Sequence, residues 1–306
     1  MTSPSPRPPA LEAVGLRKSY GDKVVLDGID LAIPAGSVFA LLGPNGAGKT
    51  TIVEILSTLI TADAGTARVL GHDLATQPDA VRAAIGVTGQ FSAVDGLLTA
   101  EENLLLMADL FHLDRAEGRR RAADLLERFD LADVATKHAA TFSGGMKRRL
   151  DLAMTMVGRP RVIFLDEPTT GLDPRSRRGV WDIVRELVAD GVTILLTTQY
   201  LEEADELADS IAVLDHGTFI AQGTSAELKR LVPTGHVEVS FVGGDTRRVP
   251  YDGDVETLRT LLADLDASGD AVADLAIHTP DLDDVFLALT GGHAATDTQV
   301  PQEAAR

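Results

Sequence analysis

A glycine-rich segment between two patterned stretches constrains this chain most: residues 43–50 read Gly-Pro-Asn-Gly-Ala-Gly-Lys-Thr. The segment matches GxxxxGK[ST], follows the apolar run VFALL and precedes the helical pattern TIVEILSTL. In such a strand–loop–helix context, glycines let backbone N–H groups wrap around phosphates, and the helix N-terminus adds a positive dipole. We expect Lys49 to reach the β- and γ-phosphates of a nucleotide, and the Thr50 hydroxyl to bind Mg²⁺. The competing interpretation, a chance Gly-rich turn, fits these flanking elements poorly.

A second apolar run ends in two carboxylates. Residues 161–167 read RVIFLDE, so Asp166 closes the predicted strand and Glu167 follows it. Asp166 can hold Mg²⁺, directly or through water, and Glu167 is the candidate general base for an attacking water. Taken alone, this run is an ordinary buried strand with an acidic end. Together with the phosphate loop it predicts a site that hydrolyses a nucleotide.

The order of elements predicts an α/β domain over residues 11–232, because short apolar runs alternate with helical patterns. Thr99 and Glu102 form a capping-box pattern before a helix. The apolar residues between Pro174 and Gly191 form one helical stripe, and Gly191 suits its C-terminal cap. The strand candidates are Val38–Leu42, Ile85–Thr88, Val162–Asp166, Thr193–Thr198 and Ile211–Leu214.

The pattern changes near Pro233, where we expect a small α+β domain over residues 233–290 with an accessory or regulatory role. Residues 1–10 are rich in proline and lack periodicity, so we expect a disordered tail there and another over residues 291–306. Within the small domain, the predicted elements are a hairpin of Val237–Phe241 and Arg247–Tyr251, a helix at Val255–Leu265, a strand at Ala276–His278 and a helix at Leu282–Leu289.

Composition excludes several classes of function. The 306 residues include no cysteine and carry a formal net charge of −18, which disfavours nucleic acid and anionic lipid as partners. Residues 231–306 hold 14 acidic and 4 basic residues, more than half of that excess, which indicates two units. The basic run Lys147–Arg149 is accordingly interpreted as a solvated helix face. Because we find no secretory signal and no apolar run of about 18 residues, we expect a soluble cytosolic protein without direct membrane insertion.

Residues 142–146 read Phe-Ser-Gly-Gly-Met, and Ser143 is placed to cap a helix whose exposed amides can bind an anion. This motif resembles LSGGQ, the signature of the ATP-binding cassette (ABC) family. Residues 11–230 as a whole are similar to the nucleotide-binding subunit of an ABC transporter. The resemblance implies a P-loop NTPase with a RecA-like core, a helical subdomain and an antiparallel β subdomain. It also implies that the signature binds the γ-phosphate of ATP held by a second copy, in a head-to-tail homodimer enclosing two ATP.

The resemblance also assigns single positions. Tyr20 stands where an aromatic ring stacks on adenine, Gln90 where a glutamine senses Mg²⁺ and contacts the membrane partner, and Asp173 in a loop that communicates across the dimer. Gln199 replaces the usual switch histidine and can donate a hydrogen bond but not carry a proton, so we place the proton chemistry on Glu167. The expected nucleotide-binding residues are Tyr20, Gly43, Pro44, Asn45, Gly46, Ala47, Gly48, Lys49, Thr50, Thr51, Gln90, Ser143, Gly144, Gly145 and Asp173. The expected metal ligands are Thr50, Gln90 and Asp166, and the expected catalytic residues are Glu167, Gln199 and Lys49.

The segment TTQYLEEAD resembles the daunorubicin/doxorubicin-resistance branch, whose subunits carry Gln at this position, and TPDLDDVFLALTG extends the similarity to residue 291. This branch implies an ATPase, using ATP and Mg²⁺, that drives a separate integral membrane permease to export a drug or secondary metabolite. The chain is then expected at the inner face of the cell membrane, held there by the permease. The alternatives are a non-transport ABC ATPase and a regulatory ATP-binding protein. Translation factors of this superfamily carry two cassettes in one chain, whereas this chain has one. Chromosome motors separate the phosphate loop from the signature by a long coiled coil, whereas here the interval is short. Both contrasts favour transport, while Gln199 keeps the regulatory alternative open.

Overall fold

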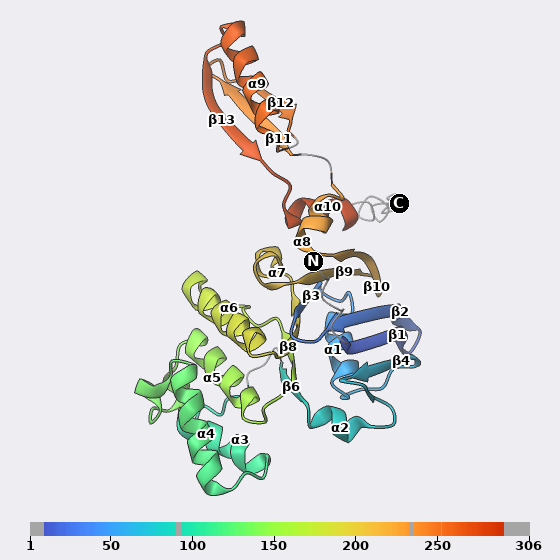
Figure 1. Ribbon diagram of the computed structural model, residues 1–306, viewed down its shortest axis with the longest axis vertical. Coiled ribbons are helices and arrows are strands. Elements are labelled where there is room, and N and C mark those ends of the chain that lie inside the picture. The colour runs from blue at the N-terminus through green and yellow to red at the C-terminus, as the bar shows by residue number, and fades with distance from the viewer. Residues whose placement is uncertain (1–8, 90–92, 233–234, 252, 291–306) are drawn as a thin grey trace, which may run out of the picture. The chain divides into compact units, whose positions relative to one another are not determined.

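The computed structural model describes residues 9–89, 93–232, 235–251 and 253–290 (Figure 1). Its contacts divide the chain into two compact units, Met1–Gln222 and Gly223–Arg306. The division lies N-terminal to the boundary expected between residues 232 and 233, because helix α8 (Ser225–Lys229) contacts helix α10 (Leu282–Thr290) and groups with the second unit. Across the described residues, no helix combines the length and the apolar character that a membrane span requires.

The first unit is built on a six-stranded sheet in the order β10-β9-β3-β8-β7-β6. Strands β3, β7 and β8 are buried along their whole length, which explains their nearly unbroken apolar sequences. β3 pairs in parallel with β8 and β9, and β7 pairs in parallel with β6 and β8. Their carboxyl ends therefore meet at one edge, where such sheets bind ligands. The strands are β3 (Val38–Leu42), β6 (Ile85–Thr88), β7 (Val162–Asp166), β8 (Thr193–Thr198), β9 (Ser210–Asp215) and β10 (Thr218–Gly223).

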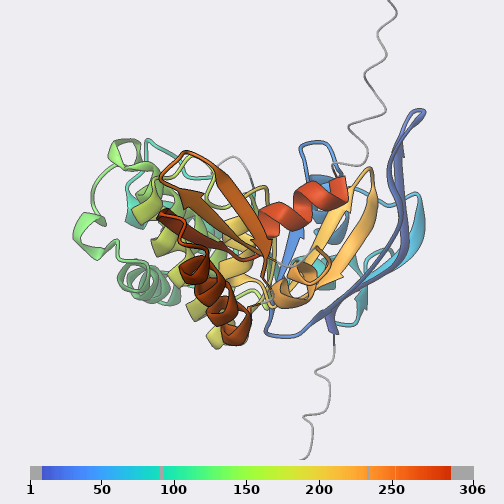
Figure 2. The same ribbon diagram turned by 90° about the horizontal axis from the view of Figure 1, so that it is seen from above.

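A second, antiparallel sheet in the order β2-β1-β4-β5 covers helix α1 (Lys49–Leu56) from the other side (Figure 1). Leu16 and Ile29 from this sheet, Ile52 from α1, and Phe164 and Leu195 from the parallel sheet belong to one buried core. This core fixes where α1 begins and hence where the phosphate loop lies. The strands are β1 (Pro9–Tyr20), β2 (Lys23–Pro34), β4 (Ala64–Val69) and β5 (His72–Asp73), and β1 and β2 form the long blue ribbon in Figure 2.

The predicted disordered tail over residues 1–10 is wrong at its C-terminal end. Pro9 pairs with Pro34 at the start of β1, and Ala10 is 1% exposed. The Ala10 carbonyl accepts a hydrogen bond from the Leu70 N–H at 2.7 Å. Pairing with two distant segments thus orders this end, while residues 1–8 lie outside the described part of the chain.

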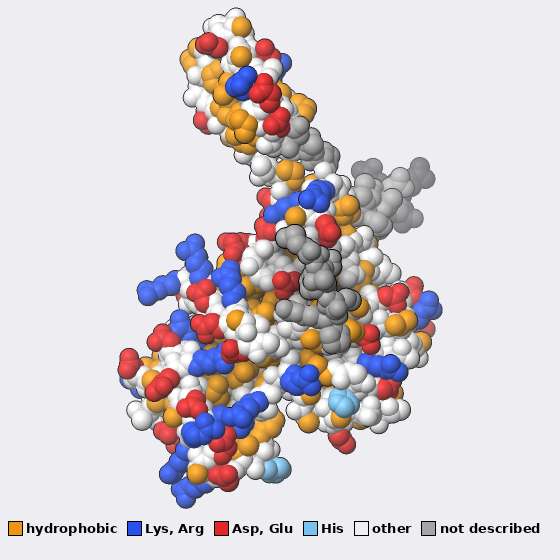
Figure 3. Space-filling view, in the orientation of Figure 1, with side chains coloured by type: hydrophobic (Ala, Val, Ile, Leu, Met, Phe, Trp, Pro, Cys, Tyr) orange, Lys and Arg blue, Asp and Glu red, His pale blue; other side chains and the backbone are white. Residues whose placement is uncertain are grey.

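The helices of the first unit have the caps that the sequence predicts. Thr99 and Glu102 form the predicted capping box of α3. Gly191 follows the last turn of α6 with a φ of 89°, as a C-terminal cap requires. Basic and acidic side chains are interspersed over these helices (Figure 3). The helices are α2 (Pro78–Arg82), α3 (Ala100–Leu110), α4 (Arg115–Arg128), α5 (Gly144–Met156), α6 (Pro174–Ala189) and α7 (Leu201–Leu207), with 3₁₀ turns at Ala132–Val134 and Ala139–Thr141.

The second unit contains an antiparallel sheet in the order β12-β11-β13, with its own small core. Val237 and Val239 of the central strand pack with Tyr251 and with Leu261 and Leu265 of α9. The predicted hairpin, both helices and the last strand are all present. They are β11 (His236–Phe241), β12 (Thr246–Pro250), α9 (Val255–Ser268), β13 (Val272–His278) and α10.

Candidate functional site

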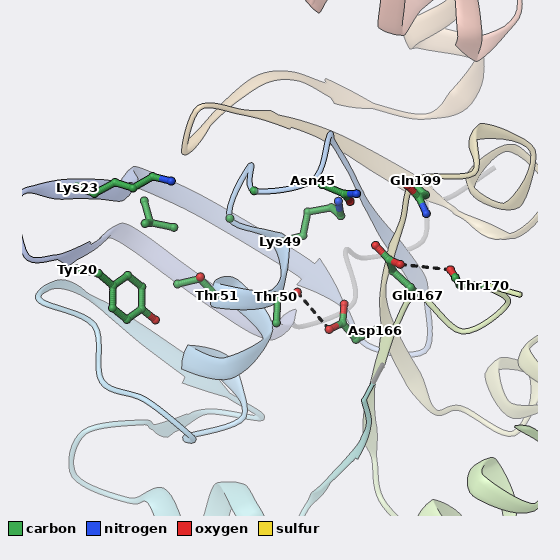
Figure 4. A pocket seen from close by; sticks show the side chains of 13 residues that line it. Tyr20, Lys23, Asn45, Lys49, Thr50, Thr51, Asp166, Glu167, Thr170 and Gln199 are labelled. Atoms are coloured by element: carbon green, nitrogen blue, oxygen red, sulfur yellow. Dashed lines mark hydrogen bonds between the residues drawn. The ribbon is translucent and has the colours of Figure 1, made fainter. Parts of the chain in front are cut away.

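A hollow of about 520 Å³ lies where the phosphate loop, the end of β7 and the segment after β8 meet. Lys49, Thr50, Asp166, Glu167 and Gln199 line it, so the structure brings together residues from three distant parts of the sequence. In Figure 4, Glu167 and Gln199 lie at one end of the site and Tyr20 and Lys23 at the other. The further lining residues are Tyr20, Lys23, Val25, Asn45, Gly46, Gly48, Thr51 and Thr170.

Two glycines of the phosphate loop are required by its geometry. A Cβ on Gly43 would lie 2.3 Å from the backbone oxygen of Leu214, so the loop passes too close to β9 for any other residue. Gly48 has a φ of 112°, which L side chains rarely adopt. It caps α1, whose first-turn N–H groups have no acceptor within the helix. These amides and the helix dipole suit a phosphate.

Lys49 is held in the loop by its own backbone. Its ammonium donates to the carbonyl oxygens of Gly43 at 2.8 Å and Pro44 at 3.2 Å, and the residue is 5% exposed. Burial lowers the pKa of Lys49 below its ordinary value, while the carboxylates of Glu167 and Asp166 raise it. The two carboxylates therefore help to keep the buried Lys49 ammonium charged.

The Asp166 carboxylate accepts hydrogen bonds from hydroxyl groups on two elements, α1 and β8. Thr50 Oγ1 donates to one carboxylate oxygen at 3.2 Å, and Thr197 Oγ1 donates to the other. Asp166 is 7% exposed. Its carboxylate and the Thr50 hydroxyl together form an oxygen donor set that suits Mg²⁺. Sequence reasoning missed Thr197, although its position at the end of the neighbouring strand, directly across from Asp166, was the available signal.

Glu167 adopts a backbone conformation that non-glycine residues rarely adopt, with a φ of 48°. Its N–H donates to the carbonyl oxygen and to the side chain of Thr197, both at 3.1 Å. Thr170 Oγ1 donates to its carboxylate at 3.3 Å. Such strain persists where the surroundings fix it, and it concentrates at functional sites. Here it turns the carboxylate into the hollow, opposite Lys49 (Figure 4).

The other expected nucleotide-binding residues lie elsewhere. Ser143 caps α5 by accepting from the Met146 N–H at 3.3 Å, and Asp173 caps α6. Ser143, Gly144 and Asp173 are exposed and none of them lines the hollow, whereas Gly145 is buried. Gln90 lies outside the described residues. Gly43, Pro44 and Ala47 belong to the phosphate loop without lining the hollow itself.

The interpretation of Lys147–Arg149 as a solvated face is wrong for Arg148, which is 9% exposed. Its guanidinium donates to the Gly89 carbonyl at 3.2 Å and to Asp151 at 3.3 Å. Asp151 in turn accepts from the Ala93 N–H at 3.1 Å. The pair therefore holds both flanks of residues 90–92. An opposite charge three residues further along a helix was the signal in the sequence.

Glu203 is a second buried group that sequence reasoning missed. One of its oxygens accepts from Thr169 Oγ1 at 2.9 Å and from Trp181 Nε1 at 3.1 Å, and the residue is 0% exposed. Burial raises the pKa of this carboxyl above its ordinary value, against hydrogen bonds from Thr198, Thr169 and Trp181. Thr169 belongs to the segment after Glu167, so Glu203 ties that segment to α7, the helix after β8.

Known proteins that are similar to this chain identify its family. The ABC transporter family model matches residues 26–170. The daunorubicin resistance ATP-binding protein DrrA2 of Streptomyces coeruleorubidus is 48% identical, over 96% of this chain and 99% of its own length. The chain belongs to the ABC transporter ATP-binding subunits. Within this family, the daunorubicin/doxorubicin resistance ATP-binding protein DrrA of Streptomyces peucetius is 46% identical, over 96% of both chains. The Nod factor export ATP-binding protein I of Ralstonia nicotianae is 39% identical, over 92% of this chain and 94% of its own.

Solved structures agree with this assignment. An ATP-binding subunit of an ABC transporter superposes with a TM-score of 0.65 at 32% identity, covering 72% of this chain and 92% of that one. The cbiO1 protein of Clostridium perfringens, part of an ABC transporter complex, gives a TM-score of 0.66 at 26% identity, covering 74% and 95%. The predicted fold class is therefore confirmed. This ABC subunit is an ATP-binding protein with a P-loop NTPase fold, and its resemblance to the daunorubicin/doxorubicin-resistance branch holds over nearly the whole chain.

Proposed function

We propose that this ABC subunit hydrolyses ATP with Mg²⁺ and uses the energy to drive a separate permease that exports a drug or secondary metabolite. The observation that carries the proposal is the meeting of Lys49, Thr50, Asp166 and Glu167 in one hollow. A cation for phosphates, an oxygen site for a metal and a second carboxylate to accept a proton from water are the parts that phosphoryl transfer to water requires.

Each residue then has a distinct task. The loop amides and Lys49 bind and orient the phosphates, and Thr50 and Asp166 hold Mg²⁺. When bound, the metal neutralises charge on the phosphate oxygens. A carboxylate oxygen of Glu167 accepts the proton of the attacking water. Gln199 donates its amide N–H to the γ-phosphate and carries no proton, since a carboxamide does not titrate near neutral pH.

Glu167→Gln tests the assigned base. We expect the rate of phosphate release to fall roughly 100-fold or more, because positioned general bases contribute on that scale, while ATP still binds. Glu186→Gln is a matched control, since Glu186 is exposed on α6 and does not line the hollow. Near-normal hydrolysis by Glu167→Gln would remove Glu167 from the proposal.

The exposed residues Ser143 and Gly144 of the signature motif support a head-to-tail homodimer. Ser143 and Gly144 at the start of α5 present a hydroxyl and backbone amides that can bind an anion, and they lie away from the hollow of their own chain, as does Asp173. In a head-to-tail pair, these groups complete the site of the second copy. A mixture of Lys49→Ala chains with Ser143→Ala chains then assembles one intact site, with the phosphate loop of one chain and the signature of the other. We expect mixing to restore part of the hydrolysis that each variant lacks alone, and no recovery would contradict the shared site.

Export and membrane attachment rest on the relatives. The three relatives described above are named for drug resistance or for Nod factor export. We propose that Gln90 and its neighbours contact the permease and hold the chain at the inner face of the membrane. The acidic second unit is proposed to stabilise the dimer or to regulate it. Co-expression with a candidate permease, such as a membrane protein encoded beside this chain, tests attachment, because the permease should retain this chain in a detergent pull-down.

A further inference from the structure

Three side chains with metal-binding atoms share one face of the sheet in the second unit. His236 and Glu238 are separated by one residue on β11, so both point to the same face of the strand. His278 of β13 lies directly across from His236. The intervening Val237 and the next residue, Val239, belong to the core on the opposite face. The face that carries the three polar residues is therefore free of that packing.

The spacing of the three groups suits one small cation. One ligand atom from each of His236, Glu238 and His278 lies within 4.8 Å of the others. The two imidazole rings are stacked, with centroids 4.8 Å apart and planes inclined by 15°. Ligands of a tetrahedral Zn²⁺ lie about 3.4 Å apart, given bond lengths near 2.1 Å. His236 and Glu238 are partly exposed and His278 is exposed, so their side chains have room to rotate toward that separation.

The surroundings favour a cation and leave room for a fourth ligand. His236 and His278 line a hollow of about 370 Å³ together with Asp281 and Asp284. These two aspartates accept each other's backbone N–H groups at 3.1 and 2.9 Å, and their carboxylates add negative charge beside the two imidazoles. The local field therefore attracts a divalent ion.

Arg248 is the competitor for this site. Its Nε donates to the Glu238 carboxylate at 2.9 Å, and the side chains are 71% and 29% exposed. An ion pair with one partner so exposed contributes little to stability. A divalent cation offers Glu238 a stronger partner, and Arg248 has space to turn into solvent.

We propose that His236, Glu238 and His278 form a Zn²⁺ site. Two imidazoles and one carboxylate are a ligand set that Zn²⁺ accepts with an open position. The ion clips the first residue of β11 to the last residue of β13, so it fixes the end of the sheet that leads into α10. The site is independent of the ATP hollow, and its occupancy does not depend on the function proposed above.

Zinc titration of the full-length chain, with any histidine tag removed, tests the proposal. Saturating Mg²⁺ occupies carboxylate-only sites, and a chromophoric chelator competes for Zn²⁺. We expect a single tight Zn²⁺ per chain, and about 100-fold or more weaker binding in the double variant His236→Asn/His278→Asn. Glu238→Gln should weaken binding about 10-fold. His72→Asn, in β5 of the first unit, is the matched control and should leave affinity unchanged.

Co²⁺ gives a second measurement, because its visible absorption is much stronger in tetrahedral than in octahedral coordination. The wild-type chain should show the strong bands and the double variant should lose them. Circular dichroism without metal checks that both variants fold, and Glu238→Gln alone tests the site if the double variant does not. The proposal is overturned if wild type binds no tight Zn²⁺, or if the folded histidine variants bind it equally well.

Discussion

Replacing Asp151 by Asn removes the charge that compensates a buried guanidinium. The Arg148 and Asp151 side chains are 10% and 3% exposed, and their charged atoms are 3.3 Å apart. At an effective dielectric constant of about 20, this separation corresponds to roughly 5 kcal/mol of attraction. Breaking a buried pair by removing one partner costs about 3–5 kcal/mol. We expect Asp151→Asn to lower the free energy of unfolding of the first unit by about 3–5 kcal/mol.

Urea unfolding followed by tryptophan fluorescence measures this change selectively. Trp181 is the single tryptophan of the sequence and is 5% exposed in α6, so it reports on the first unit. Asp182→Asn is the matched control. Asp182 pairs with Arg185 at 3.1 Å and also at a spacing of three residues, but the side chains are 68% and 47% exposed. Its loss should stay below about 0.5 kcal/mol, and an equally small loss in Asp151→Asn would refute the reasoning.

A double variant separates stability from positioning. Arg148→Met with Asp151→Leu replaces the pair by apolar side chains of similar size, which often restores stability. Gly89 and Ala93 flank residues 90–92. In this double variant the Gly89 carbonyl loses its donor Arg148, and the Ala93 N–H loses its acceptor Asp151. We therefore expect the stability of this double variant to recover toward that of wild type, while its ATP hydrolysis falls below the wild-type rate. Recovery of both would mean that the pair only stabilises the fold.

Three further substitutions test the inferred roles of Gln199, Gly43 and Glu203. Gln199→Ala should slow phosphate release about 10-fold, less than Glu167→Gln, because it removes a hydrogen bond and no proton acceptor; an equal collapse would contradict this ranking. Gly43→Ala places a Cβ 2.3 Å from a backbone oxygen of β9, so fluorescent-nucleotide binding should be lost, whereas Gly96→Ala meets only ordinary contacts at 3.5 Å and should bind normally. Burial raises the pKa of Glu203, so its stabilising effect is complete below about pH 4.5 and declines as the pH rises through the raised pKa. Urea unfolding should therefore show Glu203→Gln gaining stability relative to wild type as the pH rises above about 4.5, and a difference that does not change with pH would show that Glu203 does not titrate as inferred.

The sequence predicted those elements whose cause is local. Strands β3, β7 and β8 are apolar runs bounded by polar residues, and their bounds match the prediction. The capping box of α3 is likewise contained in four consecutive residues. Burial that depends on distant partners was not predictable in this way. Ala10 is ordered by Leu70, and Arg148 is buried because the chain folds Gly89 and Ala93 against it.

The expected ATP-binding residues separate into two groups, and this separation has a chemical consequence. Lys49 and Asp166 line the hollow, whereas Ser143 lies exposed outside it at the start of α5. Gln199, which also faces the hollow, is neutral where a protonated imidazole would add positive charge. Charge that develops on the γ-phosphate must then be stabilised by other donors, and oriented amides at a helix N-terminus are suited to that task. In the head-to-tail pair proposed above, we therefore expect a subunit with glutamine at this position to depend more strongly on the signature of the second copy for hydrolysis than one with histidine would.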